Sequence, residues 1–215
     1  FIKNFIEGVQ LTNYEKRVEN FFRIKINKKD SQIYIFEKGS IRFYEQFNFG
    51  TDIIIQDICK ICSLKPETIT NMLSSNIFRN ENYLETDLLE EKDFNGENFR
   101  KIRKKLFKDI SEARIEEMIS IIFHHNTNIK TFKKDIEKIY YLIDDKSVLS
   151  NFKKNFDKHL SLNNKFEIQL CEEFDLENTI LETINLSKFG WKKEAVPVTQ
   201  TKNTLITRIF KYLFG

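Results

Sequence analysis

The residues of this sequence that could support redox or metal chemistry are Cys59, Cys62, His124 and His125. Cys59 and Cys62 form a CxxC motif, but they lie in the apolar pattern of residues 52–62, which predicts a helix. A metal site would need a second CxxC or a nearby histidine, and neither accompanies the motif. The two histidines also have no further ligand at metal-binding spacing. We therefore expect the cysteines to be small core residues and predict no metal site.

Glycine and proline are scarce. The chain has 6 glycines and 2 prolines, whereas ordinary usage predicts about 15 and 11 in a chain of this length. Neither GxGxxG nor GxxxxGKS/T occurs, so no glycine-rich loop can hold a phosphate through its backbone N–H groups. This excludes most nucleotide-hydrolysing sites of the common types.

The composition fits one domain, or two small ones packed together, in a chain of 215 residues. Apolar residues make up 40% of the chain and charged residues 31%, which suffices for a buried core and not for a membrane span. The net charge of +3 is too small to indicate nucleic-acid binding. The odd number of cysteines favours a reducing, cytoplasmic setting.

Hydrophobic periodicity predicts paired strands followed by an alternation of strands and helices. Residues 76–96 have no period and are expected to form a loop with little fixed structure. The expected strands are residues 21–26, 31–36, 40–49, 138–143 and 166–171, and the expected helices are residues 52–62, a short one from Pro66, 99–123, 148–160 and 176–189. This order indicates an α/β or α+β protein.

Several of these segments resemble the FtsA family of bacterial cell-division proteins, which belongs to the actin/Hsp70-like ATPases. Phe36–Arg42 is similar to the family's strand–turn–strand F-x-N-G-S-L-R, and Phe49–Asp52 with Asp57-Ile58 is similar to its G-G-x-x-I-T-x-D-I. Glu112–Glu117 is similar to its x-A-R-x-E-E helix, and Leu205–Phe214 lies where the family has a membrane-targeting helix.

The resemblance implies an α/β fold: an actin-like (ribonuclease H-like) half with a mixed sheet, an inserted helical subdomain and a C-terminal amphipathic helix. It assigns residues 1–50 and 131–190 to the core subdomain and residues 51–130 to the inserted subdomain. A linker at 191–202 and the amphipathic helix at 203–215 follow. It also implies that the family's N-terminal half precedes the first residue.

Two phosphate-binding signatures of the family are altered. The acid and glycine triplet of its first hairpin are replaced by Lys25 and Asn27-Lys28-Lys29, and its Leu-Thr-Gly-Gly-Gly-Ser is replaced by Leu142–Ser147. Side chains thus occupy positions where only glycine lets the backbone approach a ligand, and Asp144 and Asp145 add negative charge. We expect little or no ATPase activity, no catalytic residue and no cofactor, although the family implies ATP.

One nucleotide-facing turn of the family persists, and it makes Gly50, Thr51 and Asp52 the candidate nucleotide-binding residues. Their backbone N–H groups could cap an anion at the start of a helix. The alternative is structural: Gly50 ends a strand, and Thr51 or Asp52 caps the helix. Lys28 and Lys29 could replace the glycine N–H groups as phosphate ligands, or they could lie in solvent.

The last segment of the chain has a single apolar face, because its apolar residues recur at i, i+1, i+4, i+5, i+8 and i+9. A helix of this kind is too short to cross a bilayer but can lie in the surface of an anionic cytoplasmic leaflet. The alternative is a helix docked on the domain's own core. The candidate membrane-binding residues are Leu205, Ile206, Arg208, Ile209, Phe210, Lys211, Leu213 and Phe214.

Six cations crowd the first turns of the helix predicted at 99–123, where they oppose the helix macrodipole. They are Arg100, Lys101, Arg103, Lys104, Lys105 and Lys108. A solvated face is the simplest interpretation, and nucleic-acid binding is a weaker one because no aromatic platform accompanies the cations. The resemblance implies a third, since FtsA binds the acidic and apolar C-terminal peptide of the tubulin-like protein FtsZ in this subdomain. The candidate partner-binding residues are Arg103, Arg114 and Glu117, with an intramolecular salt bridge as the alternative for Arg114.

We therefore predict a cell-division adaptor that tethers FtsZ filaments to lipids of the inner membrane, on its cytoplasmic side at the division septum. Self-association into filaments is a further expectation, and nucleic acid is not expected as a partner. The sequence leaves open an active actin-like ATPase and an adaptor of another membrane apparatus, similar to the pilus-assembly protein PilM.

Overall fold

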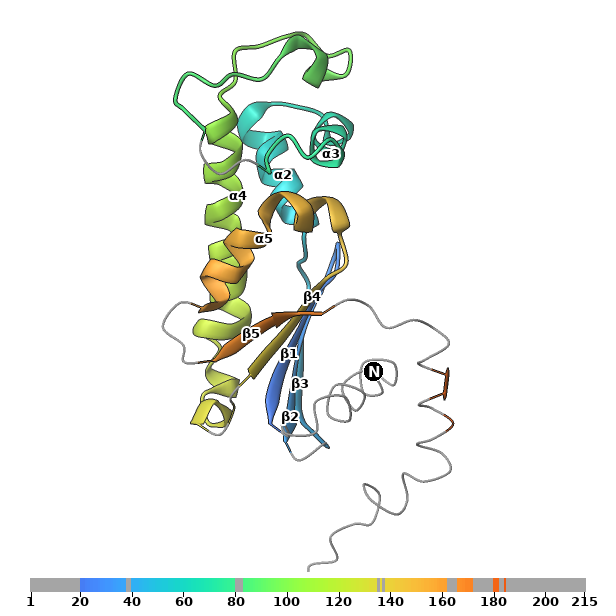
Figure 1. The fold of residues 1–215 in the computed structure, drawn as a ribbon, viewed down its shortest axis with the longest axis vertical. Coiled ribbons are helices and arrows are strands. Elements are labelled where there is room, and N and C mark those ends of the chain that lie inside the picture. Colours follow the sequence, from blue (N-terminus) through green and yellow to red (C-terminus); the bar gives the residue numbers. More distant parts are fainter. Residues whose placement is uncertain are drawn as a thin grey trace, which may run out of the picture.

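The computed structural model describes residues 20–37, 40–79, 83–134, 136, 138–161, 166–171, 180, 181 and 184. Its strands are β1 (Phe21–Ile26), β2 (Ser31–Glu37), β3 (Ser40–Phe47), β4 (Lys138–Ile143) and β5 (Glu167–Leu170), and its main helices are α2 (Asp52–Cys62), α3 (Pro66–Ser74), α4 (Lys104–Ile119) and α5 (Lys146–Ser161). The helices lie along and beyond one side of the sheet, and the long helix α4 runs from the helices beyond the sheet down along its strands (Figure 1). None of the described helices is long and apolar enough to span a bilayer.

The sheet is mixed, as the resemblance implied, and its strand order is β3-β2-β1-β4-β5. β1, β2 and β3 pair antiparallel, whereas β4 pairs parallel with β1 and β5 pairs parallel with β4. The predicted bounds of β1, β4 and α2 are confirmed at both ends. Because β1, β4 and β5 are parallel, their carboxyl ends meet at one edge of the sheet.

The two faces of the sheet bury different side chains. On one face, alternate residues such as Ile24 and Ile139 pack with α2, α4 and α5 in the main core. The other face carries a second cluster made of Phe21, Tyr34, Phe36 and Tyr140. A large apolar side chain contributes roughly 1.5–3 kcal/mol when fully buried. Burial on both faces explains why β2 has four consecutive apolar residues, Ile33–Phe36, rather than an alternating pattern.

The start of α4 differs from the prediction. The sequence predicted a helix from Phe99, but α4 begins at Lys104. The preceding residues are extended, because Leu89 N–H donates to the Ile102 carbonyl at 2.9 Å and Lys104 N–H donates to the Asp87 carbonyl at 2.8 Å. Phe99 and Ile102 therefore have helical spacing in the sequence without being in a helix. The predicted cluster of cations at the helix N-terminus is correspondingly wrong in part, since only Lys104, Lys105 and Lys108 belong to α4.

The expectation of little fixed structure at 76–96 is also wrong for the residues that the structure describes. Phe78 is buried, its ring stacks on that of Phe107 at 4.8 Å, and its N–H donates to Asn151 Oδ1 at 3.0 Å. Phe94 is fully buried at the end of a 3₁₀ turn that begins at Glu91. Isolated buried aromatic side chains hold this loop in place, and isolated residues leave no periodic pattern in the sequence.

A π-helical turn, Ser120–His124, follows α4 where the sequence predicted regular helix to Phe123. The wider turn buries both Ile122 and Phe123 while Ile121 stays exposed. The Phe123 ring meets that of Phe22 in β1 edge-on at 5.1 Å. The turn thus fastens the lower end of α4 to the sheet.

The helix predicted at 176–189 lies mostly outside the described residues, and the linker and amphipathic helix predicted at 191–215 lie wholly outside them. The subdomain boundaries derived from the resemblance stay predictions.

Candidate functional site

The candidate site is the edge of the sheet where β1 and β4 end, which we call the carboxyl edge and define by residues 27–30, 50–52 and 144–147. α2 and α5 both begin there (Figure 1), and Asp144 N–H donates to the carbonyl of Ile26 at 3.0 Å. In open α/β sheets, ligands bind outside the carboxyl ends of the strands. This is the edge at which the altered phosphate signatures and the Gly50 turn come together.

Gly50 lies directly against the β1–β2 hairpin turn. A Cβ atom at this position would be 2.1 Å from the carbonyl oxygen of Asn27 and 2.6 Å from that of Lys28, so only glycine allows the approach. The same two carbonyls accept hydrogen bonds from Thr51 N–H at 3.0 Å and Asp52 N–H at 2.9 Å. The N–H groups proposed to cap an anion therefore already bond to the hairpin backbone.

Asp145 supplies the chain's own anion at the start of α5. It is buried, and its Oδ1 accepts hydrogen bonds from the N–H groups of Ser147 at 3.0 Å and Val148 at 3.1 Å. The ammonium group of Lys28 lies 3.9 Å from its Oδ2. A helix N-terminus favours negative charge, and here a carboxylate takes that position. A phosphate brought to α5 would meet this charge.

Arg114 joins α4 to α2. Its Nε donates to Asp57 Oδ2 of α2, and its Nη1 donates to Glu117 Oε2 one turn further along α4. This is the intramolecular salt bridge that the sequence left open as the alternative. Arg103, the third candidate partner-binding residue, lies before α4 and about three helical turns from Arg114. The structure therefore brings Arg114 and Glu117 together and leaves Arg103 apart from them.

Acids of the preceding loop meet the cations around the start of α4. Glu85 accepts from Arg103 Nη1 at 2.7 Å and also from Lys105, and these bonds, chiefly the one from Lys105, hold the pKa of Glu85 below its ordinary value. Arg100 Nη2 donates to the carbonyl of Ser63 at 2.6 Å. No sequence pattern predicts these contacts of Arg100, Arg103 and Lys105, because an irregular loop separates the partners.

Cys62 is a core residue, as the sequence predicted, and Cys59 is half-buried against the same core. Cys62 is buried, and burial raises the pKa of its thiol to about 11. The described residues contain no cluster of three or more potential metal ligands. His124 Nε2 lies 2.6 Å from the carbonyl oxygen of His159 and ties the π-helical turn to α5. The predicted membrane-binding residues of the tail lie outside the described residues.

Comparison with solved structures identifies the architecture. No protein-family model matches the sequence, and no curated protein matches it. The ethanolamine utilization protein EutJ from Carboxydothermus hydrogenoformans is 14% identical, with a TM-score of 0.51 over 78% of this chain and 49% of that one. MreB 5 of Spiroplasma citri bound to AMPPNP is 13% identical, with a TM-score of 0.52 over 88% of this chain and 58% of that one. The fold is actin-like.

This likeness concerns the fold alone, because the identities are low. The chain spans about half the length of the structures that it matches.

Proposed function

We propose that this protein is an actin-like adaptor of the FtsA kind, with little or no ATPase activity. In this proposal it holds FtsZ filaments at the cytoplasmic face of the inner membrane, at the division septum. The observation that carries it is the sequence pattern of Leu205–Phe214, a short amphipathic segment that follows an actin-like fold. The resemblance of Phe49–Asp52 and Glu112–Glu117 to FtsA supports the choice of partner.

The tail is suited to weak, reversible membrane contact. Its cations Arg208 and Lys211 each add about 1 kcal/mol on an anionic leaflet, and its six large apolar side chains add roughly 1.5 kcal/mol each when buried. Ordering so short a helix costs a comparable amount per residue. One tail therefore binds weakly, while many tails on one filament bind tightly through their effective concentration.

We infer little or no ATPase activity from the hydrogen bonds made at the carboxyl edge. The N–H groups of Thr51 and Asp52 bond to the hairpin backbone, and the Asp145 carboxylate caps α5. Both features oppose the binding of a phosphate in this half of the fold.

Vesicle and filament co-sedimentation test the adaptor role. The full-length protein is expected to bind vesicles that contain phosphatidylglycerol and to carry FtsZ filaments to them. Phe210→Glu is expected to abolish vesicle binding without loss of the fold, whereas Thr207→Glu on the polar face is expected to keep most of it. Unfolding by Phe210→Glu would instead indicate a tail docked on the core. Loss of FtsZ binding after removal of FtsZ's C-terminal peptide is expected, and no binding to intact FtsZ would favour another apparatus, such as a PilM-like one.

An active actin-like ATPase is the second candidate, favoured by the similarity to an MreB 5 structure with bound AMPPNP. Titration of the full-length protein with ATP separates the two candidates. If the protein is an adaptor, we expect no saturable binding at micromolar ATP. Micromolar affinity for ATP would contradict the claim that it has little or no ATPase activity.

A further inference from the structure

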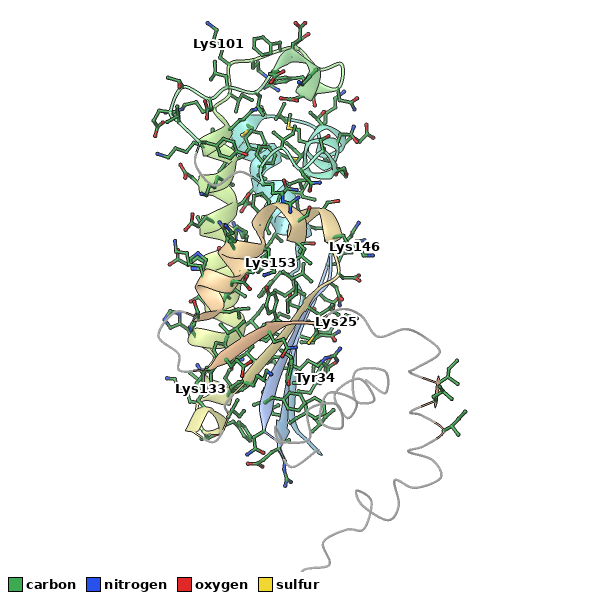
Figure 2. The ribbon with its side chains drawn as sticks, viewed as in Figure 1. Lys25, Tyr34, Lys101, Lys133, Lys146 and Lys153 are labelled. Atoms are coloured by element: carbon green, nitrogen blue, oxygen red, sulfur yellow. The ribbon has the colours of Figure 1, made fainter. Side chains whose placement is uncertain are left out.

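A groove runs along α5 on the side of the edge strand β5. A cavity of about 480 Å³ opens where α5 is kinked at Phe152, and a second of about 500 Å³ continues between α5 and β5. The two share Lys153, Lys154 and Leu170 in their walls. Lys153 lies on α5 above β5, away from Lys146 at the carboxyl edge (Figure 2). The groove is therefore separate from the candidate site described above.

The groove is strongly basic. Asp157 is the one acid among the described residues that line it, and it bonds to Lys153 Nζ at 2.8 Å and accepts from the hydroxyl of Tyr141. The cations that line it are Arg79, Lys108, Lys153, Lys154 and Lys158. Lys158 Nζ also bonds to Glu112 of α4, outside the lining of the groove. Cations gathered in a groove with apolar walls give a positive potential that attracts acidic partners.

The floor of the groove is apolar. β5 alternates, so that Ile168 and Leu170 are half-buried toward the helices while Glu167 and Gln169 are exposed on the opposite face. Ile168 and Leu170 both line the groove. A ligand of this surface must therefore bury apolar side chains and carry negative charge.

The backbone of β5 offers hydrogen bonds along the same groove. Cys171 N–H donates to the Tyr141 carbonyl at 2.8 Å, and because successive residues of a strand alternate, Gln169 and Cys171 face β4. Ile168 and Leu170 thus direct their N–H and C=O groups to the outer edge. Within the described part of the chain, β5 pairs only with β4. An edge of this kind accepts an added strand.

Asn155 has a buried hydrogen-bond donor that an acceptor on a ligand in the groove would satisfy. Its side chain lines the cavity at the kink, and its Nδ2 atom is buried with no hydrogen-bond acceptor among the described residues. A buried amide donor without an acceptor is costly. A peptide carbonyl or carboxylate in the groove would satisfy it.

We propose that this groove binds an extended acidic peptide of a partner protein, which adds to β5 as a sixth strand. Every second residue of the peptide faces the helices, where its apolar side chains cover Ile168 and Leu170 and its carboxylates meet the cations of α5. The inference does not depend on the proposed membrane or filament role.

A labelled nonapeptide tests the chemistry of the groove. The probe is acetyl-Asp-Thr-Ile-Thr-Asp-Thr-Leu-Thr-Glu-amide, and its binding to the 215-residue chain is followed by fluorescence anisotropy. The proposal expects saturable binding that weakens with salt and at least about tenfold weaker binding when Asn and Gln replace the acids. Lys153→Ala with Lys158→Ala is expected to weaken binding about tenfold. Lys60→Ala with Lys101→Ala, on exposed lysines elsewhere, is expected to leave it unchanged. No binding, or equal binding of the neutral peptide, overturns the proposal.

The strand-addition geometry has its own test. Ile168→Pro removes an outward N–H without touching the ladder to β4, and it is expected to weaken peptide binding at least about tenfold relative to Ile168→Val. Hydrogen exchange on the unmodified chain tests the same point if the proline variant does not fold. The amides of Ile168 and Leu170 are expected to exchange more slowly with peptide bound, and unchanged exchange overturns the proposal. Dimerisation of the chain through this edge, blocked by Ile168→Pro, would assign the groove to a second copy and also overturn it.

Discussion

Gly50 meets the backbone of Asn27 so closely that its missing Cβ would lie 2.1 Å from the Asn27 carbonyl oxygen. The contact joins the end of the β3 segment to the β1–β2 hairpin turn, next to the hydrogen bond from Thr51 N–H to the same oxygen. The carboxyl edge of this actin-like fold is thus closed by backbone packing in this half of the protein.

Gly50→Ala is therefore expected to destabilise the fold by at least about 2 kcal/mol, because the added methyl group meets two backbone carbonyls that cannot rotate away. Chemical denaturation measures the free energy of unfolding. Gly96→Asn is the matched control, since Gly96 has a φ of +80° and open space around it, and asparagine tolerates that conformation. Equal losses in the two variants would contradict the close contact.

The hydrogen bonds of Asp145 predict a contrast between two substitutions. Asp145→Ala removes the cap of α5 and is expected to cost about 1 kcal/mol of unfolding free energy. Asp145→Asn keeps a capping oxygen and is expected to cost only a few tenths of that amount, because the Lys28 ammonium group is largely exposed. Thermal or urea unfolding of both variants checks this. A large loss with asparagine would mean that the charge, and not the cap, stabilises this turn.

The sequence predicted the elements whose residues repeat with a regular period. α2 has the expected bounds because its apolar positions recur with each turn, and β1 and β4 because they are short apolar runs, buried along nearly their whole length. The start of α4 was misplaced because Phe99 and Ile102 have helical spacing, whereas residues 102–104 pair with residues 87–89 through the backbone. That pairing joins segments separated by an irregular loop, and no local pattern reveals it.

The sequence predicted where the residues of the candidate site lie in the fold, but not which hydrogen bonds they make. The sequence placed Gly50, Thr51 and Asp52 at the start of a helix, where the structure has them. It could not indicate that the carbonyls of Asn27 and Lys28 accept their N–H groups, because a carbonyl's direction depends on the hairpin's backbone. Asp145 was read as a charge facing a ligand, whereas it turns to cap its own helix.

The salt bridges of Arg114 and Arg103 are expected to differ in strength. Arg114 and Asp57 are both partly buried between α4 and α2, whereas Arg103 and Glu85 are both well exposed. A double-mutant cycle of Arg114→Ala and Asp57→Ala is expected to give a coupling of about 1 kcal/mol. The corresponding cycle of Arg103→Ala and Glu85→Ala is expected to give less than about 0.5 kcal/mol. A larger coupling at Arg103 would show that the basic segment before α4 is structural and not available to a partner.

His159 makes stability depend on pH. Its ring is buried beside α4 with no hydrogen-bond partner within the described residues, and Glu112 lies 3.8 Å from its Nε2. Burial lowers the pKa of His159 below 6.5, against the opposing effect of Glu116, with Lys158 adding to the decrease. Burial likewise lowers the pKa of His124.

The unfolded chain therefore binds protons first as the pH falls. Stability is complete above about pH 6.5 and decreases below it, by up to about 1.4 kcal/mol per pH unit for each histidine. Urea unfolding between pH 8 and pH 5.5 measures this, above the range where the carboxylates titrate. His159→Phe with His124→Phe is expected to flatten the profile. A constant free energy of unfolding down to pH 5.5 would mean that water or a neighbouring carboxylate stabilises the protonated ring.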